Sequence, residues 1–126
     1  MPTRPAIIFY YEENQMLLQT VKDVLEFAGW YVRPCSSDGY AFVYAGNSEH
    51  FDLMILDHDS RVSGLELVRR ARQNAHRANT PIILISLDIA AEALAAGADA
   101  FLRKPNNLVE LVDTIRRLLA SRRDTA

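Results

Sequence analysis

Residues 52–57 read DLMILD, four apolar residues in a row between two aspartates, and this stretch decides the fold. An apolar run without polar alternation is typical of a strand that is buried on both faces, as in a parallel sheet. The chain contains four more short runs of this kind, at 6–11, 30–35, 81–86 and 100–104. We therefore expect five strands, of which residues 52–56 form the third.

Segments with apolar residues at helical spacing follow the runs. The third segment begins with Ser63 and Glu66 in a capping-box pattern, and the last begins with Asn107 and Glu110 in the same pattern. Gly29 is expected to stop the first helix. The expected buried stripes are Leu17, Val21, Val24, Leu25 and Ala28 in the first helix, Leu65, Val68, Ala71 and Ala75 in the third, and Leu108, Leu111, Val112, Ile115, Leu118 and Leu119 in the last.

The second and fourth helical segments carry weaker patterns. Residues 37–50 have only a rough helical face, made of Tyr40, Phe42, Val43 and Tyr44. The alanine-rich stretch 88–97 predicts a short helix with Asp88 as its N-cap and Gly97 beyond its end.

The regular alternation of strand and helix predicts an α/β fold built around a parallel sheet. Pro34 lies inside the second run, and because proline cannot donate to a ladder, that strand should lie at an edge of the sheet. We expect a single domain over residues 1–126, with a core at about 5–121 and a tail or the start of a linker at 122–126.

The composition excludes several classes of function. Fourteen basic and sixteen acidic residues give a net charge of −2, which provides no basic field for nucleic acid. Cys35 is the single cysteine, so the chain can form neither an internal disulfide nor a thiolate metal cluster. The first apolar run is shorter than a signal-peptide core or a membrane span. We therefore expect a cytoplasmic protein that binds neither nucleic acid nor a membrane.

Polar residues end several of the apolar runs, and in an open α/β sheet ligands bind outside the carboxyl ends of the strands. These residues are Glu12, Glu13, Asp57, Ser86 and Lys104. Clustered carboxylates repel each other unless a hard cation such as Mg²⁺ lies among them, and a lysine with a hydroxyl can hold a phosphoryl group. Asp57 is the candidate acceptor, because a carboxylate can form an acyl phosphate.

The sequence resembles the receiver domain of bacterial two-component response regulators. The resemblance is carried, in order along nearly the whole chain, by the acidic pair, DLMILD, SGLELVRRAR, TPIILIS and AGADAFLRKP. It implies a flavodoxin-like (βα)5 fold with a doubly wound parallel sheet of strand order 2-1-3-4-5. The edge position of the second strand in that order agrees with Pro34.

The resemblance also implies roles for individual residues. Asp57 would be phosphorylated by a histidine kinase or a phosphotransfer protein, and Ser86 and Lys104 would contact the phosphoryl group. Mg²⁺ would be bound by Glu12, Glu13, Asp57 and the backbone carbonyl of Asp59. Phe101 would be the switch aromatic, and the peptide between Lys104 and Pro105 would be cis.

The resemblance further implies what the domain does in the cell. The face made by the fourth helix, the fifth strand and the fifth helix would change its affinity for a downstream protein or a fused output domain. The protein would then be a regulatory switch that catalyses its own phosphorylation, and not a metabolic enzyme.

Several features depart from the family pattern. Glu12 and Glu13 replace aspartates, which could weaken Mg²⁺ binding, and Tyr10 and Tyr11 could occupy the acidic positions if the strand were shorter. The loop after Asp57 is one residue short, and Asp59 adds a further carboxylate. Leu87 replaces a small residue, and the segment up to Gly97 is about four residues shorter than is typical.

Four alternatives stay open. A divergent receiver could have lost phosphorylation and serve as a protein-interaction module, and a flavodoxin-like small-molecule binder shares the architecture, although the chain has no glycine-rich run to hold a phosphate. Phe101 could be simply a core residue. The basic residues Arg116, Arg117, Arg122 and Arg123 are expected to be solvated, with pairing across a homodimer as the alternative.

Overall fold

The computed structural model describes residues 4–57, 64–87, 90–104 and 107–124. The strands are β1 (Ile7–Tyr11), β2 (Tyr31–Cys35), β3 (Leu53–Asp57), β4 (Ile82–Ser86) and β5 (Ala100–Arg103). The helices are α1 (Gln15–Phe27), α2 (Asp38–Gly46), α3 (Gly64–Gln73), α4 (Ala90–Ala96) and α5 (Leu108–Asp124). Every predicted element is present, and the boundaries of the strands differ by no more than one residue from the predicted runs.

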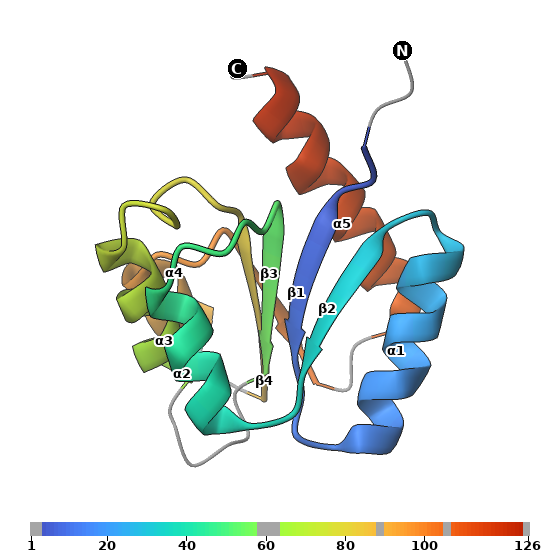
Figure 1. The fold of residues 1–126 in the computed structure, drawn as a ribbon, viewed down its shortest axis with the longest axis horizontal. Helices are drawn as coiled ribbons and strands as arrows, with labels where there is room; N and C mark the ends of the chain where they lie inside the picture. The colour runs from blue at the N-terminus through green and yellow to red at the C-terminus, as the bar shows by residue number, and fades with distance from the viewer. Residues whose placement is uncertain (1–3, 58–63, 88–89, 105–106, 125–126) are drawn as a thin grey trace.

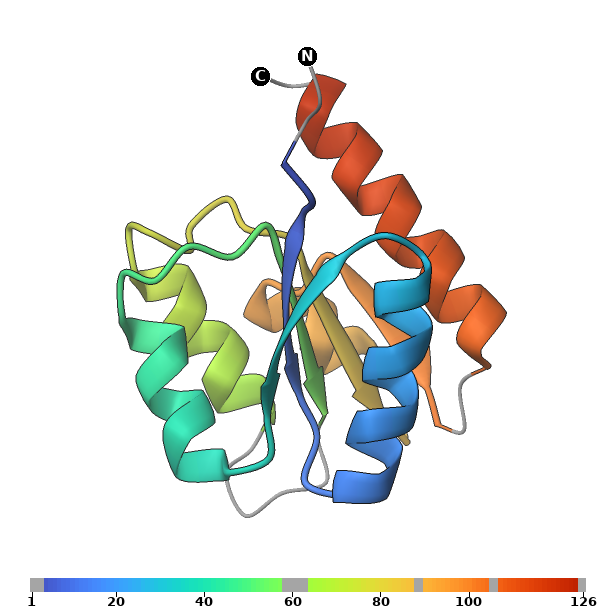
Figure 2. The ribbon, with the colours of Figure 1, turned by 45° about the vertical axis from the view of Figure 1, so that its right-hand side comes forward.

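The five strands form one parallel sheet in the order β2-β1-β3-β4-β5, which confirms the predicted fold. Helices α1 and α5 cover one face of the sheet, and α2, α3 and α4 cover the other (Figure 1). Figure 2 shows the sheet between these two layers after a rotation of 45°. Pro34 lies in β2 at the edge of the sheet, as its missing N–H group requires.

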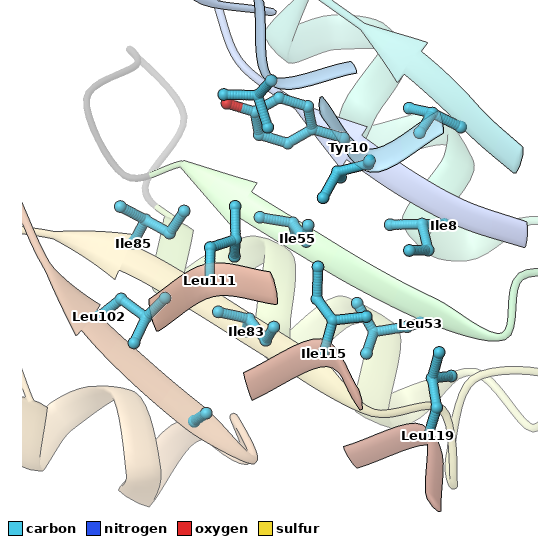
Figure 3. Close-up of a cluster of buried hydrophobic side chains, with 14 of the residues drawn as sticks. Ile8, Tyr10, Leu53, Ile55, Ile83, Ile85, Leu102, Leu111, Ile115 and Leu119 are labelled. Atoms are coloured by element: carbon cyan, nitrogen blue, oxygen red, sulfur yellow. The ribbon is translucent and has the colours of Figure 1, made fainter. Parts of the chain in front are cut away.

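Each face of the sheet carries its own hydrophobic cluster, because alternate residues of a strand point to opposite sides. In β3, Leu53 and Ile55 belong to the cluster under α1 and α5, whereas Met54 and Leu56 belong to the other cluster. Figure 3 shows the first cluster, in which the strand residues pack against Leu111, Ile115 and Leu119 of α5. Asp57 continues the alternation of Leu53 and Ile55, so its side chain belongs to the α1–α5 face.

The predicted stripe of α5 is confirmed, since Leu111, Ile115 and Leu119 are buried. In α1, Val21 and Leu25 are buried as predicted, but Leu17 is 45% exposed and its neighbour Leu18 is buried instead. Ala75 lies beyond the end of α3 and is exposed.

The predicted face of α2 is wrong. Ala41 and Ala45 are its buried residues, and Tyr40, Phe42 and Val43 are exposed. Six consecutive apolar residues occupy positions 40–45, so spacing alone could not select a face. Burial of alanine lets the helix approach the sheet closely, and of the predicted face only Tyr44 packs inward, against Phe9 and Phe51.

Capping residues account for several helix boundaries. The Asn107 side chain accepts a hydrogen bond from the backbone N–H of Glu110 at 2.6 Å, which confirms the predicted start of α5. Gly29 and Gly97 have φ angles of 104° and 114°, the left-handed conformation that ends a helix. The predicted caps Ser63 and Asp88 lie outside the described residues. Within the described ranges, no helix is long and apolar enough to cross a membrane.

Candidate functional site

A close ion pair lies at the carboxyl end of the sheet. Asp57 is the last residue of β3, and Lys104 follows β5 directly, where its backbone N–H donates to the carbonyl of Ser86 at 2.8 Å. The Lys104 ammonium donates to Oδ1 of Asp57 at 2.6 Å, across 47 positions of sequence. The two side chains are only 18% and 5% exposed. Such a charge-assisted hydrogen bond in a buried setting is much stronger than a pair on the surface.

Glu12 brings a second carboxyl group to Asp57. It is the first residue after β1, its backbone N–H donates to the carbonyl of Cys35 at 2.9 Å, and it is 5% exposed. The pKa of Glu12 is raised to about 7. Burial is the largest cause, and the charge of Asp57 and a hydrogen bond to Asp57 act in the same direction. The backbone N–H of Asn14 and the charge of Lys104 act in the opposite direction. Glu12 and Asp57 therefore bring two carboxyl groups together beside the single ammonium group of Lys104.

Glu13 is placed differently from Glu12. It is exposed, and its Oε1 accepts a hydrogen bond from the hydroxyl of Tyr11 at 3.1 Å. It lines the same cavity as Glu12 and Asp57. Tyr10 and Tyr11 are buried residues of β1, paired with Ile55 and Leu56, so the carboxyl group that reaches Asp57 belongs to Glu12 and not to a shifted tyrosine position.

These groups line a cavity of about 770 Å³ between the carboxyl ends of the strands and the helices α1 and α5. The strand-end residues in its wall are Tyr10, Glu12, Glu13, Asp57, Ile85, Leu87 and Lys104. The helices contribute Leu17, Thr20, Val21, Leu108 and Leu111, and Asn14 adds to the lining. In Figure 3 the hydroxyl of Tyr10 points toward the Ile85 end of the sheet. Burial raises the pKa of Tyr10 strongly, and the charges of Glu12 and Asp57 add to that effect.

The sequence did not single out Leu17 or Leu111 as residues near the site, and it named Tyr10 only as an alternative occupant of an acidic position. For Tyr10 a signal was available: it precedes Glu12 by two positions, and residues two apart in a strand point to the same face. Leu17 was assigned to the core stripe of its helix, and its exposure of 45% shows that it faces the cavity opening instead.

The structure does not bring Ser86 into this cavity. Ser86 is 3% exposed and follows Asp57's ladder partner, Ile85. By alternation it shares the face of Ile82 and Leu84, opposite to the face of Asp57. Phe101 is half-buried and packs against the cluster on that same opposite face. Leu87 lines the cavity and is 61% exposed.

Two predicted site residues, Asp59 and Pro105, lie outside the described residues, as does most of the shortened loop after Asp57. Within the described part of the chain, no three His, Cys, Asp or Glu side chains gather closely enough to hold a metal ion. The chain does bring together two carboxyl groups, from Glu12 and Asp57. Two carboxylates suit Mg²⁺, which commonly keeps several waters and uses one or two protein carboxylates.

Comparison with known proteins decides the family. The family profile described as "Response regulator receiver domain" matches residues 8–116. The chain belongs to the response regulator receiver family. This confirms the resemblance seen in the sequence. The acidic edge of the sheet is therefore part of a receiver domain of two-component signalling.

Individual relatives agree with this assignment. The receiver domain is 34% identical over 123 residues to the sensory/regulatory protein RpfC of Xanthomonas campestris pv. campestris, an alignment that covers 92% of this chain and 16% of that protein. The chain thus spans a small part of the length of this curated relative.

Solved structures share the fold over almost the whole chain. A CheY-like response regulator receiver domain protein from Methanospirillum hungatei superposes with a TM-score of 0.88 at 25% identity, covering 98% of this chain and 100% of the other. The receiver domain of a sensor histidine kinase from Pseudomonas aeruginosa, with a magnesium ion coordinated in its active site cleft, gives a TM-score of 0.81 at 21% identity. That alignment covers 93% of this chain and 99% of the other.

Proposed function

We propose that Asp57 accepts a phosphoryl group from a histidine kinase or a phosphotransfer protein, in a Mg²⁺-dependent reaction. The observation that carries the proposal is the buried Asp57 carboxylate, held at 2.6 Å by Lys104 and flanked by Glu12 at the carboxyl edge of the sheet. An acceptor needs a fixed oxygen, an adjacent cation and a way to shed negative charge, and these three residues supply them.

In the proposed reaction, an oxygen of Asp57 attacks the phosphorus of a phosphohistidine. The phosphorus–nitrogen bond breaks, its electron pair leaves with the imidazole, and an acyl phosphate forms on Asp57. The attacking group is the carboxylate form of Asp57, because a protonated carboxyl group is a poor nucleophile. Lys104 is close enough to transfer its hydrogen bond from the carboxylate to an oxygen of the incoming group.

A bound Mg²⁺ would neutralise the charge that gathers on the phosphoryl oxygens. We propose Glu12 and Asp57 as direct ligands, Glu13 as a contributor from the cavity wall, and the backbone carbonyl of Asp59 as the ligand implied by the family. The ion reported in the Pseudomonas aeruginosa receiver domain supports this proposal by analogy of fold.

The output of the switch would be the face formed by α4, β5 and α5, with a downstream protein or a fused domain as the partner in a cytoplasmic pathway. The backbone hydrogen bond from Lys104 to Ser86 joins the ends of β5 and β4. A movement of Lys104 toward a phosphoryl group would therefore be transmitted to Ser86, and through β5 to Phe101. The domain's task would be regulation and not metabolic catalysis.

The second candidate function is a phosphorylation-independent interaction module. It is favoured by the raised pKa of Glu12, because a carboxyl group that takes up a proton readily is a weaker ligand for Mg²⁺.

One experiment separates the two candidates. The protein is incubated with Mg²⁺ and acetyl phosphate, and its intact mass is compared before and after, with Asp57→Asn as the control. Beryllofluoride with Mg²⁺ serves as a second probe, followed by tyrosine fluorescence. A phosphoryl adduct that Asp57→Asn abolishes supports the switch. The absence of any adduct and of any response to beryllofluoride would leave the interaction module as the better account.

A further inference from the structure

The proposed phosphoryl chemistry uses only one corner of the cavity. Glu12, Asp57 and Lys104 stand at the strand ends, whereas the wall toward the helices is largely apolar. A hydrated Mg²⁺ ion and a phosphoryl group make no use of leucine and valine side chains. The apolar wall therefore needs a separate explanation.

Two leucines mark the opening of the cavity. Leu17 of α1 is 45% exposed and Leu87, after β4, is 61% exposed, and both line the cavity. Val21 and Leu111 continue the apolar wall inward and are buried. Exposed leucines beside an apolar wall are typical of a binding site for an organic group, because removing these side chains and the organic group from water is favourable.

The charge of the cavity selects the kind of ligand. Three carboxyl groups, from Glu12, Glu13 and Asp57, face a single ammonium group among the described lining residues, and that ammonium, on Lys104, is already bonded to Asp57. An anionic ligand would be repelled, and a cationic group would relieve the repulsion between the carboxylates. The volume of about 770 Å³ lies within the range of small-molecule sites.

We propose that this cavity binds a small organic cation. Its ammonium or amidinium group would lie against Glu12 and Asp57, and its aromatic or aliphatic body against Leu17, Val21 and Leu111. Because the cationic group and Mg²⁺ would use the same carboxylates, the ligand would inhibit phosphorylation by competition. That regulatory consequence rests on the proposed function, whereas binding itself does not.

Binding is tested on the whole chain without Mg²⁺ by isothermal titration calorimetry with three molecules of similar shape. Phenethylammonium carries the cation and the ring, 2-phenylethanol carries no charge, and 3-phenylpropionate carries a negative charge. We expect phenethylammonium to bind at least about tenfold more tightly than the alcohol, and the carboxylate not to bind. Equal binding of the alcohol and the cation, or no binding of the cation, would overturn the proposal.

Two neighbouring residues of α1 give a matched pair for the apolar wall. Leu17 lines the cavity, whereas Met16 is 80% exposed and does not belong to its lining. Leu17→Ser should weaken phenethylammonium binding by about tenfold, and Met16→Ser should leave it unchanged, with folding checked by circular dichroism. Equal effects of the two substitutions would show that the ligand lies elsewhere. Glu12→Gln should reduce the preference for the cation over the alcohol.

The consequence for signalling is tested by competition. Phenethylammonium should raise the apparent dissociation constant of Mg²⁺ and slow adduct formation from acetyl phosphate. Cation binding without any phosphoryl adduct would overturn the proposed function and leave the ligand site intact. Adduct formation without cation binding would overturn only the ligand site.

Discussion

The two ends of the same sheet hold charged side chains in opposite ways. At the amino end, the guanidinium of Arg72 donates to the carbonyls of Gly97, Arg77 and Thr80 and to Oδ2 of Asp99, at distances between 2.6 and 2.9 Å. At the carboxyl end, Glu12 and Asp57 place two acidic groups against each other, with Lys104 as the described partner. At the amino end, the cation is paired with a carboxylate and with backbone carbonyls. At the carboxyl end, two acidic groups lie close together.

The amino-end network joins four parts of the chain. Arg72 comes from α3, Thr80 from the loop before β4, Gly97 from the end of α4, and Asp99 from the segment before β5. Asp99 also accepts a hydrogen bond from the backbone N–H of Ile82 at 2.8 Å. The contrast separates two kinds of environment: one end fixes the elements, and the other keeps a repulsion between carboxyl groups that a cation can relieve.

The largest expected effect comes from breaking the amino-end network. Arg72→Ala removes donors from several backbone carbonyls and leaves Asp99 without its cation. We expect the free energy of unfolding to fall by about 3 kcal/mol or more, because several partly buried acceptors lose their partners together. Urea denaturation measures this loss. Arg69→Ala, an exposed arginine on the same helix, is the control and should stay within about 0.5 kcal/mol of the wild type.

A smaller effect is expected at the carboxyl end, where ionisation of Glu12 should lower the free energy of unfolding and removal of its charge should raise it. Burial and the neighbouring Asp57 raise the pKa of Glu12 from 4.5 to about 7 in the folded protein. Between these values the folded state keeps a proton that the unfolded chain releases, so the folded state binds more protons and the free energy of unfolding falls as the pH rises. Above about pH 7 the loss is complete. One pKa unit corresponds to about 1.4 kcal/mol, so we expect a total loss of about 2 kcal/mol after allowance for solvent screening.

Glu12→Gln tests this sign directly. Without Mg²⁺, the variant should lack the fall in stability between about pH 4.5 and pH 7, and it should be more stable than the wild type above that range. Glu13→Gln, at the exposed neighbouring residue, should follow the wild-type curve. The measurement is urea denaturation at a series of pH values. A Glu12→Gln curve parallel to the wild-type curve would show that Glu12 is not strained by Asp57.

The positions of Asp57 and Lys104 could be predicted because parallel strands end at a common edge, so residues that end apolar runs are brought together. The same rule could not place neighbouring residues correctly. Glu12 and Glu13 differ by one position, as do Ile85 and Ser86, and consecutive residues at a strand end project to different sides. Glu12 reaches Asp57 while Glu13 lies at the exposed wall of the same cavity, and Ile85 lines that cavity while Ser86 does not. Side-chain direction, and not strand position, was the missing information.

The amino-end network and the face of α2 escaped prediction for a different reason. The partners of Arg72 lie up to 27 positions away and are mostly backbone carbonyls, which leave no pattern in the sequence. In α2, the apolar run at 40–45 fits every helical face equally well. Packing of small residues against the sheet decides the face, and that depends on contacts distant in the sequence.

The smallest effects come from two glycines that sharpen the same contrast. Gly97 has a φ angle of 114°, and an added Cβ would lie 2.8 Å from Cγ of Arg72. Gly97→Ala should therefore lower the free energy of unfolding by about 1.5 kcal/mol, through backbone strain and displacement of the Arg72 side chain. Gly39 lies in the first turn of α2, where an added Cβ would meet only Ser37 Oγ, at 3.8 Å.

Gly39→Ala should thus raise stability by about 0.5 kcal/mol, because alanine restricts the unfolded chain and favours the helix. Thermal and urea denaturation of both variants measure the difference. Combining Gly97→Ala with Arg72→Ala separates the two causes at Gly97. If the Arg72 side chain is the obstacle, Gly97→Ala will cost less in the Arg72→Ala background than alone. An unchanged cost would assign the effect to the backbone, and the amino-end network would then tolerate a side chain at Gly97.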